Sequence, residues 1–346
     1  MMPDTPSTTT PPAPRVADTG STATRVFAQT LLSVLAGFTL PVLACYGLII
    51  VSVLALQILS WGAASGPTSS RGPTTGPAVA IIHVEGVITS GSGTPFDTGG
   101  IAFSNDVIEN VRKANEDAEV KAIVLAVNSP GGGVVASDEI YHALSEVEKP
   151  IVVVVGDLGA SGGYYISMAS DWIVANPNSL VGSIGVISEF PNAEGLLEKV
   201  GVDFVVITSG ERKDIGSPYR EMTDAEREYW QTIIDETYEG FVEIVAQGRE
   251  LTVDEVKPLA DGGVFTGRQA LELKLIDQLG YEEDAITKAA ELGGITGEPR
   301  IVEYNREPTF FELLFGLASR PSLLPSLAEI MNLVGHPSLS ARWVGQ

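Results

Sequence analysis

The fold of this chain is decided by one stretch, Ile151-Val-Val-Val-Val-Gly-Asp-Leu-Gly-Ala-Ser-Gly-Gly163. Its β-branched run follows Lys149-Pro150 and stops at Gly156, which is typical of a strand buried on both faces. Good helix formers come after Gly163. A turn of small residues between a buried strand and a helix exposes one side chain at the N-terminus of the helix. The free N–H groups there favour negative charge. Ser161 occupies this position, which makes it a candidate nucleophile.

Neighbouring segments repeat the pattern of short apolar strands and helices. Strands are predicted at 78–88, 122–127, 172–175, 180–187 and 203–208, and helices at 104–114, 136–147 and 224–238. Strands that alternate with helices of this length predict βαβ crossovers and a mostly parallel sheet. The predicted fold class is therefore α/β.

Composition limits the classes of partner. The chain has 346 residues and a net charge of −23, which argues against a nucleic-acid partner. Its single cysteine, Cys45, excludes an intrachain disulfide bond. The sequence also lacks an HExxH motif, so it predicts no metal site.

The N-terminal part is organised differently from the rest. Residues 1–25 are rich in Pro, Ser and Thr and predict a disordered tail. Residues 26–61 are apolar and uncharged, longer than the ~20 residues that span hydrocarbon, and predict a transmembrane segment. One kinked span and a tight hairpin both fit this segment. Residues 62–77 predict a linker, residues 78–298 a globular domain and residues 299–346 an apolar C-terminal extension.

The orientation of the span rests on few charges. Arg15 and Arg25 precede it, which favours an N-terminus inside the cell, but Arg71 follows it closely. We expect the domain after the span to lie outside the cytoplasm. The apolar C-terminal extension would fit packing on that domain, contact with a neighbouring subunit or the membrane interface.

Two loops are predicted at the carboxyl ends of neighbouring strands, where sites gather in α/β sheets. The first is Ser129-Pro-Gly-Gly-Gly133, and the second carries Ser161. The N–H group of Gly131 or Gly132 and that of Gly162 could together bind an oxyanion. The first loop has neither the lysine nor the spacing of a P-loop, which disfavours phosphate.

A nucleophilic serine needs a base. His142 lies in a predicted helix and His336 in the tail, and neither is a convincing candidate for the base. His83 lies on a predicted strand, where a hydrogen-bonded sheet histidine is the simpler interpretation, but its role as the base stays open. A lysine also serves if burial lowers its pKa toward neutrality. Lys213 follows a predicted strand in a loop of turn residues, where a plain surface lysine is the alternative.

Several motifs occur together and in a characteristic order. They are Asn128-Ser-Pro-Gly-Gly-Gly133, Ala160-Ser-Gly-Gly-Tyr-Tyr165, Val181-Gly-Ser-Ile-Gly-Val186, Lys213-Asp-Ile-Gly-Ser-Pro218, Glu239-Gly-Phe241, Gly248-Arg249, Asp261–Ala270 and Leu275–Gly280. This combination resembles the signal peptide peptidase A (SppA) family of membrane serine peptidases, over about Val79 to Glu291. The resemblance implies a fold like that of the ClpP and crotonase group, with repeated ββα and βαβ units.

The resemblance also implies roles for five residues. Ser161 matches the nucleophile and Lys213 the general base. Ser183 matches the serine that orients the lysine amine, and Gly132 and Gly162 match the oxyanion-hole donors. A neutral lysine can take the serine proton and later deliver it to the leaving amine, so no cofactor is needed.

Each motif occurs once, as in the short form of the family. The resemblance then implies a ring-like homo-oligomer, octameric in the characterised example, whose adjacent protomers contribute lysine and serine. It implies a cell-membrane enzyme in contact with lipid that cuts apolar peptides such as remnant signal peptides. The alternatives are a related peptidase specific for a stomatin-like partner, a silent scaffold and a crotonase-type acyl-CoA enzyme.

Overall fold

The computed structural model describes residues 52, 69–93, 100–304 and 339–342. The chain divides into two compact units, Met1–Ser65 and Gly66–Gln346. The predicted tail and, apart from residue 52, the predicted transmembrane segment lie outside the described residues. Of the helices that the structure describes, none has both the length and the apolar character needed to cross a bilayer.

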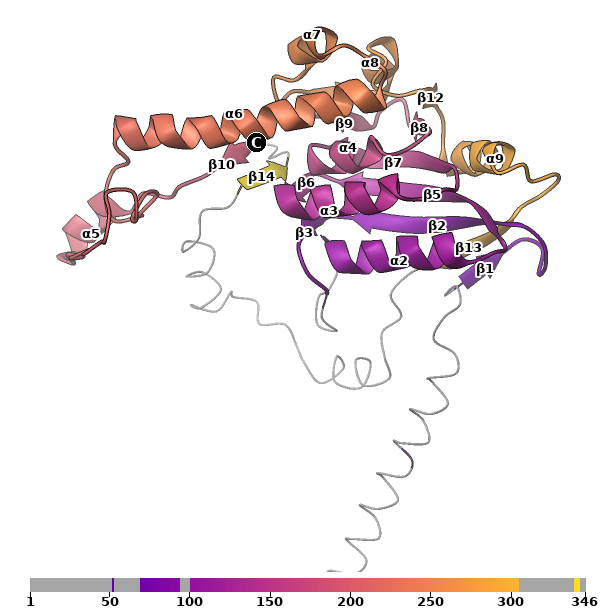
Figure 1. The fold of residues 1–346 in the computed structure, drawn as a ribbon, viewed down its shortest axis with the longest axis horizontal. Coiled ribbons are helices and arrows are strands. Elements are labelled where there is room, and N and C mark those ends of the chain that lie inside the picture. The colour runs from indigo at the N-terminus through magenta and orange to yellow at the C-terminus, as the bar shows by residue number, and fades with distance from the viewer. Residues whose placement is uncertain (1–51, 53–68, 94–99, 305–338, 343–346) are drawn as a thin grey trace, which may run out of the picture. The chain divides into compact units, whose positions relative to one another are not determined.

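A mixed sheet forms the centre of the second unit (Figure 1). Seven strands lie in the order β1 (Ser69–Arg71), β13 (Arg300–Tyr304), β2 (Ala78–Glu85), β5 (Val120–Ser129), β7 (Ile151–Ala160), β8 (Trp172–Ala175) and β12 (Gln278–Leu279). The strands from β13 to β12 are parallel, as the apolar runs predict. At the C-terminal end of β7, β9 (Leu180–Gly182) pairs with it in parallel, and β11 (Val264–Thr266) pairs antiparallel with β9.

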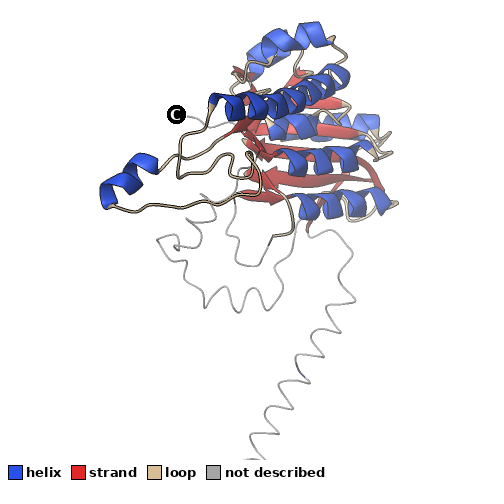
Figure 2. Ribbon diagram, turned by 60° about the vertical axis from the view of Figure 1, so that its left-hand side comes forward, coloured by secondary structure: helices blue, strands red, loops and turns tan. Residues whose placement is uncertain are grey.

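Helices cover both faces of this sheet (Figure 2). One face carries α2 (Ser104–Glu116), α3 (Val134–Ser145) and α4 (Gly162–Ser167), and the other carries α9 (Glu282–Leu292). Alternation along β7 explains why both faces are apolar, since Val153 belongs to the first core and Val152 to the second. The predicted α/β fold class is confirmed.

A second, smaller sheet lies beside the main one. Its order is β10 (Ile187–Ser188), β14 (Leu339–Arg342), β6 (Gly131–Gly133), β3 (Val87–Thr89) and β4 (Ile101–Phe103). β14 belongs to the C-terminal extension and pairs antiparallel with both β10 and β6. This part of the extension therefore packs on the globular unit.

The long helix α6 (Asp224–Gly248) joins this body to a projecting segment. Phe241, Val242 and Val245 bury its C-terminal half in the core. Residues 189–223, which we call the arm, precede α6 and include α5 (Glu194–Val200). Figures 1 and 2 show α5 and its flanking loops extending away from the sheet. The remaining short helices are α7 (Val253–Val256), η1 (Lys257–Leu259) and α8 (Gly267–Glu272).

Three sequence-based expectations differ from the structure. The predicted strand at 203–208 is wrong, because these residues are exposed and pair with no strand among the described residues. The predicted strand at 180–187 is broken by Ser183, whose φ is 51°. The main sheet also takes in β1 from the predicted linker and β13 from the predicted extension.

A buried ion pair connects two of the sequence motifs. The Arg249 guanidinium donates to both Asp277 carboxylate oxygens, over 2.7 and 3.0 Å, and to the Lys274 carbonyl over 2.8 Å. Asp277 also accepts the Ile173 N–H group over 2.8 Å, which ties the end of α6 to β8. The Arg249 side chain is 8% exposed, so its charge depends on this partner.

Asp277→Asn should destabilise the fold, because it leaves the buried Arg249 charge unpaired. We expect the free energy of unfolding to fall by about 3 kcal/mol, measured by urea denaturation. Glu116→Gln removes an exposed partner of Arg112 and serves as the control, with an expected change below about 0.5 kcal/mol. Equal effects of the two substitutions would contradict the structural role of Asp277.

Candidate active site

Ser161 lies where β7 ends and α4 begins. Its φ of 52° and ψ of −118° place a non-glycine residue in a strained region, as in sharp strand-to-helix turns that present a nucleophile. The Ser161 N–H group donates to the Gly182 carbonyl over 2.7 Å, and the residue is only 1% exposed. The predicted position at a helix N-terminus is confirmed.

The segment 129–133 before α3 packs closely against β3 and against this turn. A Cβ atom on Gly132 would lie 1.9 Å from the Ile88 carbonyl oxygen, and one on Gly163 would lie 2.8 Å from that of Ser129. The Ser129 hydroxyl donates to the Gly86 carbonyl over 2.6 Å and accepts the Gly131 N–H over 3.0 Å. β6, which contains Gly132, contacts α4, which begins at Gly162. The structure thus brings together the elements of the two predicted oxyanion donors.

Ser183 lies beside Ser161 because of the register between β7 and β9. Ala160 is paired with Gly182, so the next residue of each strand is a serine with positive φ. The Ser183 N–H group donates to the Gly263 carbonyl over 2.7 Å, and Ser183 is 6% exposed. The two serines that the sequence motifs single out therefore lie next to each other in the fold.

The two serines line one cavity of about 470 Å³. Its other lining residues come from the segment after β9, from α6 and from the turn before β11: Gly185, Val186, Ile187, Gln231, Ile234, Asp235, Tyr238, Ala260, Asp261 and Gly262. The sequence motifs did not indicate that α6 forms a wall of this site. The side chains of Val186, Ile187 and Ile234 give it an apolar part.

Lys213 lies in the arm and not beside the two serines. It is exposed, belongs to a run of turns in the arm and is not among the described residues that line the Ser161 cavity. Its N–H group donates to the Gly210 carbonyl over 3.1 Å. The chain thus brings Ser161 and Ser183 together, while Lys213 is presented on the projecting arm.

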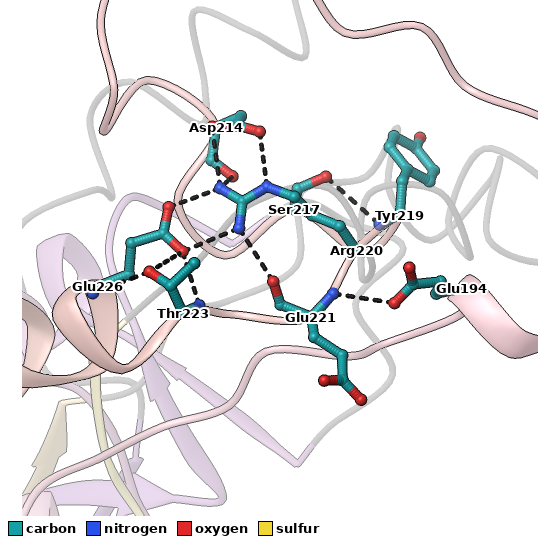
Figure 3. Close-up of polar contacts among 8 residues, drawn as sticks. All are labelled: Glu194, Asp214, Ser217, Tyr219, Arg220, Glu221, Thr223 and Glu226. Atoms are coloured by element: carbon teal, nitrogen blue, oxygen red, sulfur yellow. Dashed lines mark hydrogen bonds and ion pairs between the residues drawn. The ribbon is translucent and has the colours of Figure 1, made fainter.

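Charged residues next to Lys213 form a cluster that the motifs did not reveal (Figure 3). Arg220 contacts the carboxylates of Asp214 and Glu226, and Glu226 caps α6. The spacing of Thr223 and Glu226 is that of a capping box, which the sequence does display. The link from Arg220 to both carboxylates appears only when the turn is folded.

His83, the alternative base, faces a different cavity. It lies on β2 with Nδ1 3.8 Å from a Glu85 carboxylate oxygen, and its side chain is 30% exposed. His83 lines a cavity of about 580 Å³ with residues such as Asn128 and Asp157, whereas Ser161 and Ser183 line the other one. The geometry therefore does not support His83 as the partner of Ser161.

Comparison with known proteins agrees with this geometry. The sequence profile of peptidase family S49 matches residues 143–296, and that of ClpP-like SDH-type serine proteinases matches residues 75–203. The described α/β unit thus has a ClpP-like fold.

Relatives extend the match over more of the chain. A Synechocystis sp. protein provisionally named a protease is 42% identical over 257 residues, 74% of this chain and 88% of that protein. An Enterococcus faecium protein provisionally named signal peptide peptidase SppA is 38% identical over 66% of this chain and 67% of its own length. A Methanocaldococcus jannaschii protein, also provisionally named a protease, is 44% identical over 58% of this chain and 65% of its own length.

These matches, the mixed ClpP-like sheet and the paired serines at the end of β7 and β9 all indicate the same class of enzyme. The chain belongs to peptidase family S49, a family of serine peptidases.

Proposed function

We propose that this peptidase is an endopeptidase that cleaves apolar, signal-peptide-like segments with a Ser161/Lys213 dyad. The observation that carries the proposal is the placement of Ser161 and Ser183 in one partly apolar cavity. Ser183 would accept or donate a hydrogen bond that orients the lysine amine. The N–H groups of Gly132 and Gly162 would bind the oxyanion.

The chemical steps follow from these roles. The Ser161 oxygen attacks the scissile carbonyl carbon while its proton passes to the neutral amine of Lys213. The tetrahedral oxyanion collapses, the C–N bond breaks and the ammonium of Lys213 gives its proton to the leaving amine. Water then attacks the acyl-serine ester with Lys213 again as the base, which restores the free hydroxyl.

The position of Lys213 supports a dyad shared between chains. Lys213 is exposed on the arm of its own chain, and the same arm exposes Val205 and Ile207 at 88% and 92%. Contact with a second copy would cover such apolar surface and bring the lysine to a neighbouring Ser161. Burial there would disfavour the charged ammonium, as a general base requires. We therefore propose a ring-like homo-oligomer.

The position of β14 suggests how a peptide substrate binds. β14 lies between β6, which contains Gly132, and β10, whose Ile187 lines the Ser161 cavity. Its backbone pairs with both neighbours, so this slot accepts an extended chain. We propose that a substrate binds in the same slot after displacing β14.

The membrane location remains part of the proposal. The predicted span at 26–61 would anchor the chain, with the peptidase unit outside the cytoplasm and near lipid-embedded substrates. The similarity to the relative named signal peptide peptidase SppA supports apolar remnant peptides as substrates.

Ser161→Ala and Lys213→Ala should each lower kcat/KM by about 10³-fold or more, because the dyad acts as a unit. Co-expression of the two variant chains should restore part of the activity, since one chain supplies the lysine and the other the serine. The measurement is cleavage of a signal-peptide-like substrate in detergent, with folding checked by circular dichroism.

His83→Ala is the control and should keep near-normal turnover. An active Lys213→Ala enzyme would disprove the role of Lys213 as base. Inactive mixed oligomers would disprove a dyad shared between chains.

Deletion of residues 339–346 should lower KM for a peptide substrate by about tenfold with little change in kcat, because substrate no longer competes with β14. A synthetic peptide of residues 339–346 should raise KM of the truncated enzyme again. Deletion of residues 343–346 alone, which keeps β14, is the control. An unchanged KM in the longer deletion would contradict substrate binding in this slot.

A further inference from the structure

Arg220 donates hydrogen bonds to Asp214, Glu221 and Glu226 (Figure 3). Its Nε donates to Asp214 Oδ2 over 2.9 Å and its Nη2 to Asp214 Oδ1 over 3.0 Å. On its other side, Nη1 donates to Glu226 Oε2 over 2.8 Å and Nη2 to Glu226 Oε1 over 2.5 Å. Nη1 also donates to the Glu221 carbonyl over 3.0 Å. One planar guanidinium thus joins two carboxylates in paired hydrogen bonds, which is the strong, direction-specific form of ion pairing.

The first carboxylate belongs to the residue that follows Lys213. Asp214 is held on both oxygens by Arg220, and its own carbonyl accepts the Ser217 N–H group over 3.0 Å. The backbone of Lys213 is therefore attached directly to a fixed residue, although its side chain is exposed.

The second carboxylate belongs to the first turn of α6. Glu226 Oε2 accepts the Thr223 N–H over 2.9 Å and the Thr223 hydroxyl over 3.0 Å, which completes the capping box of α6. Further along, α6 lines the Ser161 cavity through residues such as Ile234 and Tyr238. Arg220 therefore connects the turn that carries Lys213 to a helix that also forms a wall of the serine site.

Both carboxylates stay charged over a wide pH range. Hydrogen bonding to Arg220 lowers the pKa of Glu226 to about 2 and also lowers the pKa of Asp214. A carboxylate with a depressed pKa keeps its partner until the pH falls toward that value. The cluster is thus intact at the neutral and alkaline pH at which a lysine can act as a base.

We propose that Arg220 is a positioning residue for Lys213, which fixes the lysine-bearing turn to the N-terminus of α6. This inference rests on the proposed dyad but concerns a residue outside it. Without Arg220, the turn would lose both carboxylate contacts, and the lysine amine would reach the neighbouring serine less often. The loss would appear in kcat more than in KM, because substrate binding does not involve Arg220.

The test uses full-length mixed oligomers in which only one chain can supply the lysine. Ser161→Ala chains supply Lys213, and Lys213→Ala chains supply Ser161. Arg220→Gln is introduced into either type of chain before co-expression, and cleavage of a signal-peptide-like substrate is measured. We expect kcat to fall about 10²-fold when Arg220→Gln is in the lysine-supplying chain, as for a small misplacement of a catalytic group. In the serine-supplying chain, it should change kcat less than twofold.

Comparing Arg220→Gln in the lysine-supplying chain with Arg220→Gln in the serine-supplying chain distinguishes a loss of lysine positioning from a general loss of folding. Equal losses in both placements, or no loss in the lysine-supplying chain, would overturn the proposal. Asp214→Asn in the lysine-supplying chain is the second variant and should lower kcat similarly, without further loss when combined with Arg220→Gln. The exposed Arg227→Gln on α6 removes the same charge and should leave kcat unchanged.

Controls distinguish failure of this inference from failure of the dyad. If the mixed oligomer with intact Arg220 is inactive, or if Lys213→Ala chains are active alone, the proposed Ser161/Lys213 dyad shared between chains is disproved, and the inference about Arg220 is disproved with it. If the mixture is active and follows neither expected pattern, Arg220 has no positioning role.

Discussion

The pairing of β9 with the end of β7 is the constraint on which the whole site depends. One backbone hydrogen bond, from the Ser161 N–H to the Gly182 carbonyl, marks the point where both strands end. Register in a sheet has a period of two, so a slip of one residue would send a side chain to the opposite face. Val181, the central residue of β9, is buried in the first core, which disfavours such a slip. Core packing thus determines the distance between two polar side chains.

Much of the fold and of the serine site could be predicted from local sequence. β-branched runs identify the parallel strands because burial on both faces leaves little room for polar residues. Small residues around Ser161 identify the turn, and the structure shows why one of them is needed, because a Cβ atom on Gly163 would collide with the Ser129 carbonyl at the end of β5. Ser183 required a motif resemblance, since nothing in its own segment shows that β9 pairs with β7.

The rest depends on contacts that local patterns do not contain. Residues 203–208 have the composition of a strand, but composition does not supply a partner strand. β14 is short and pairs over a long sequence separation, so its segment gave no strand signal. Arg220 is six residues from each of its two carboxylates, which is beyond the i,i+3 and i,i+4 pairs that a helix brings together. The exposed position of Lys213 likewise follows from the path of the arm.

The arm contains a segment that would make the protein prone to aggregate. Val202 to Thr208 contains one charged residue, Asp203, and no proline, and it is exposed and pairs with no strand among the described residues. Open, β-branched segments of this kind join edge to edge with other strands and promote aggregation. A destabilised or truncated form of the protein would therefore aggregate first through this segment. Polar substitutions at the exposed Val205 and Ile207 would be the first choice for improving the solubility of the protein.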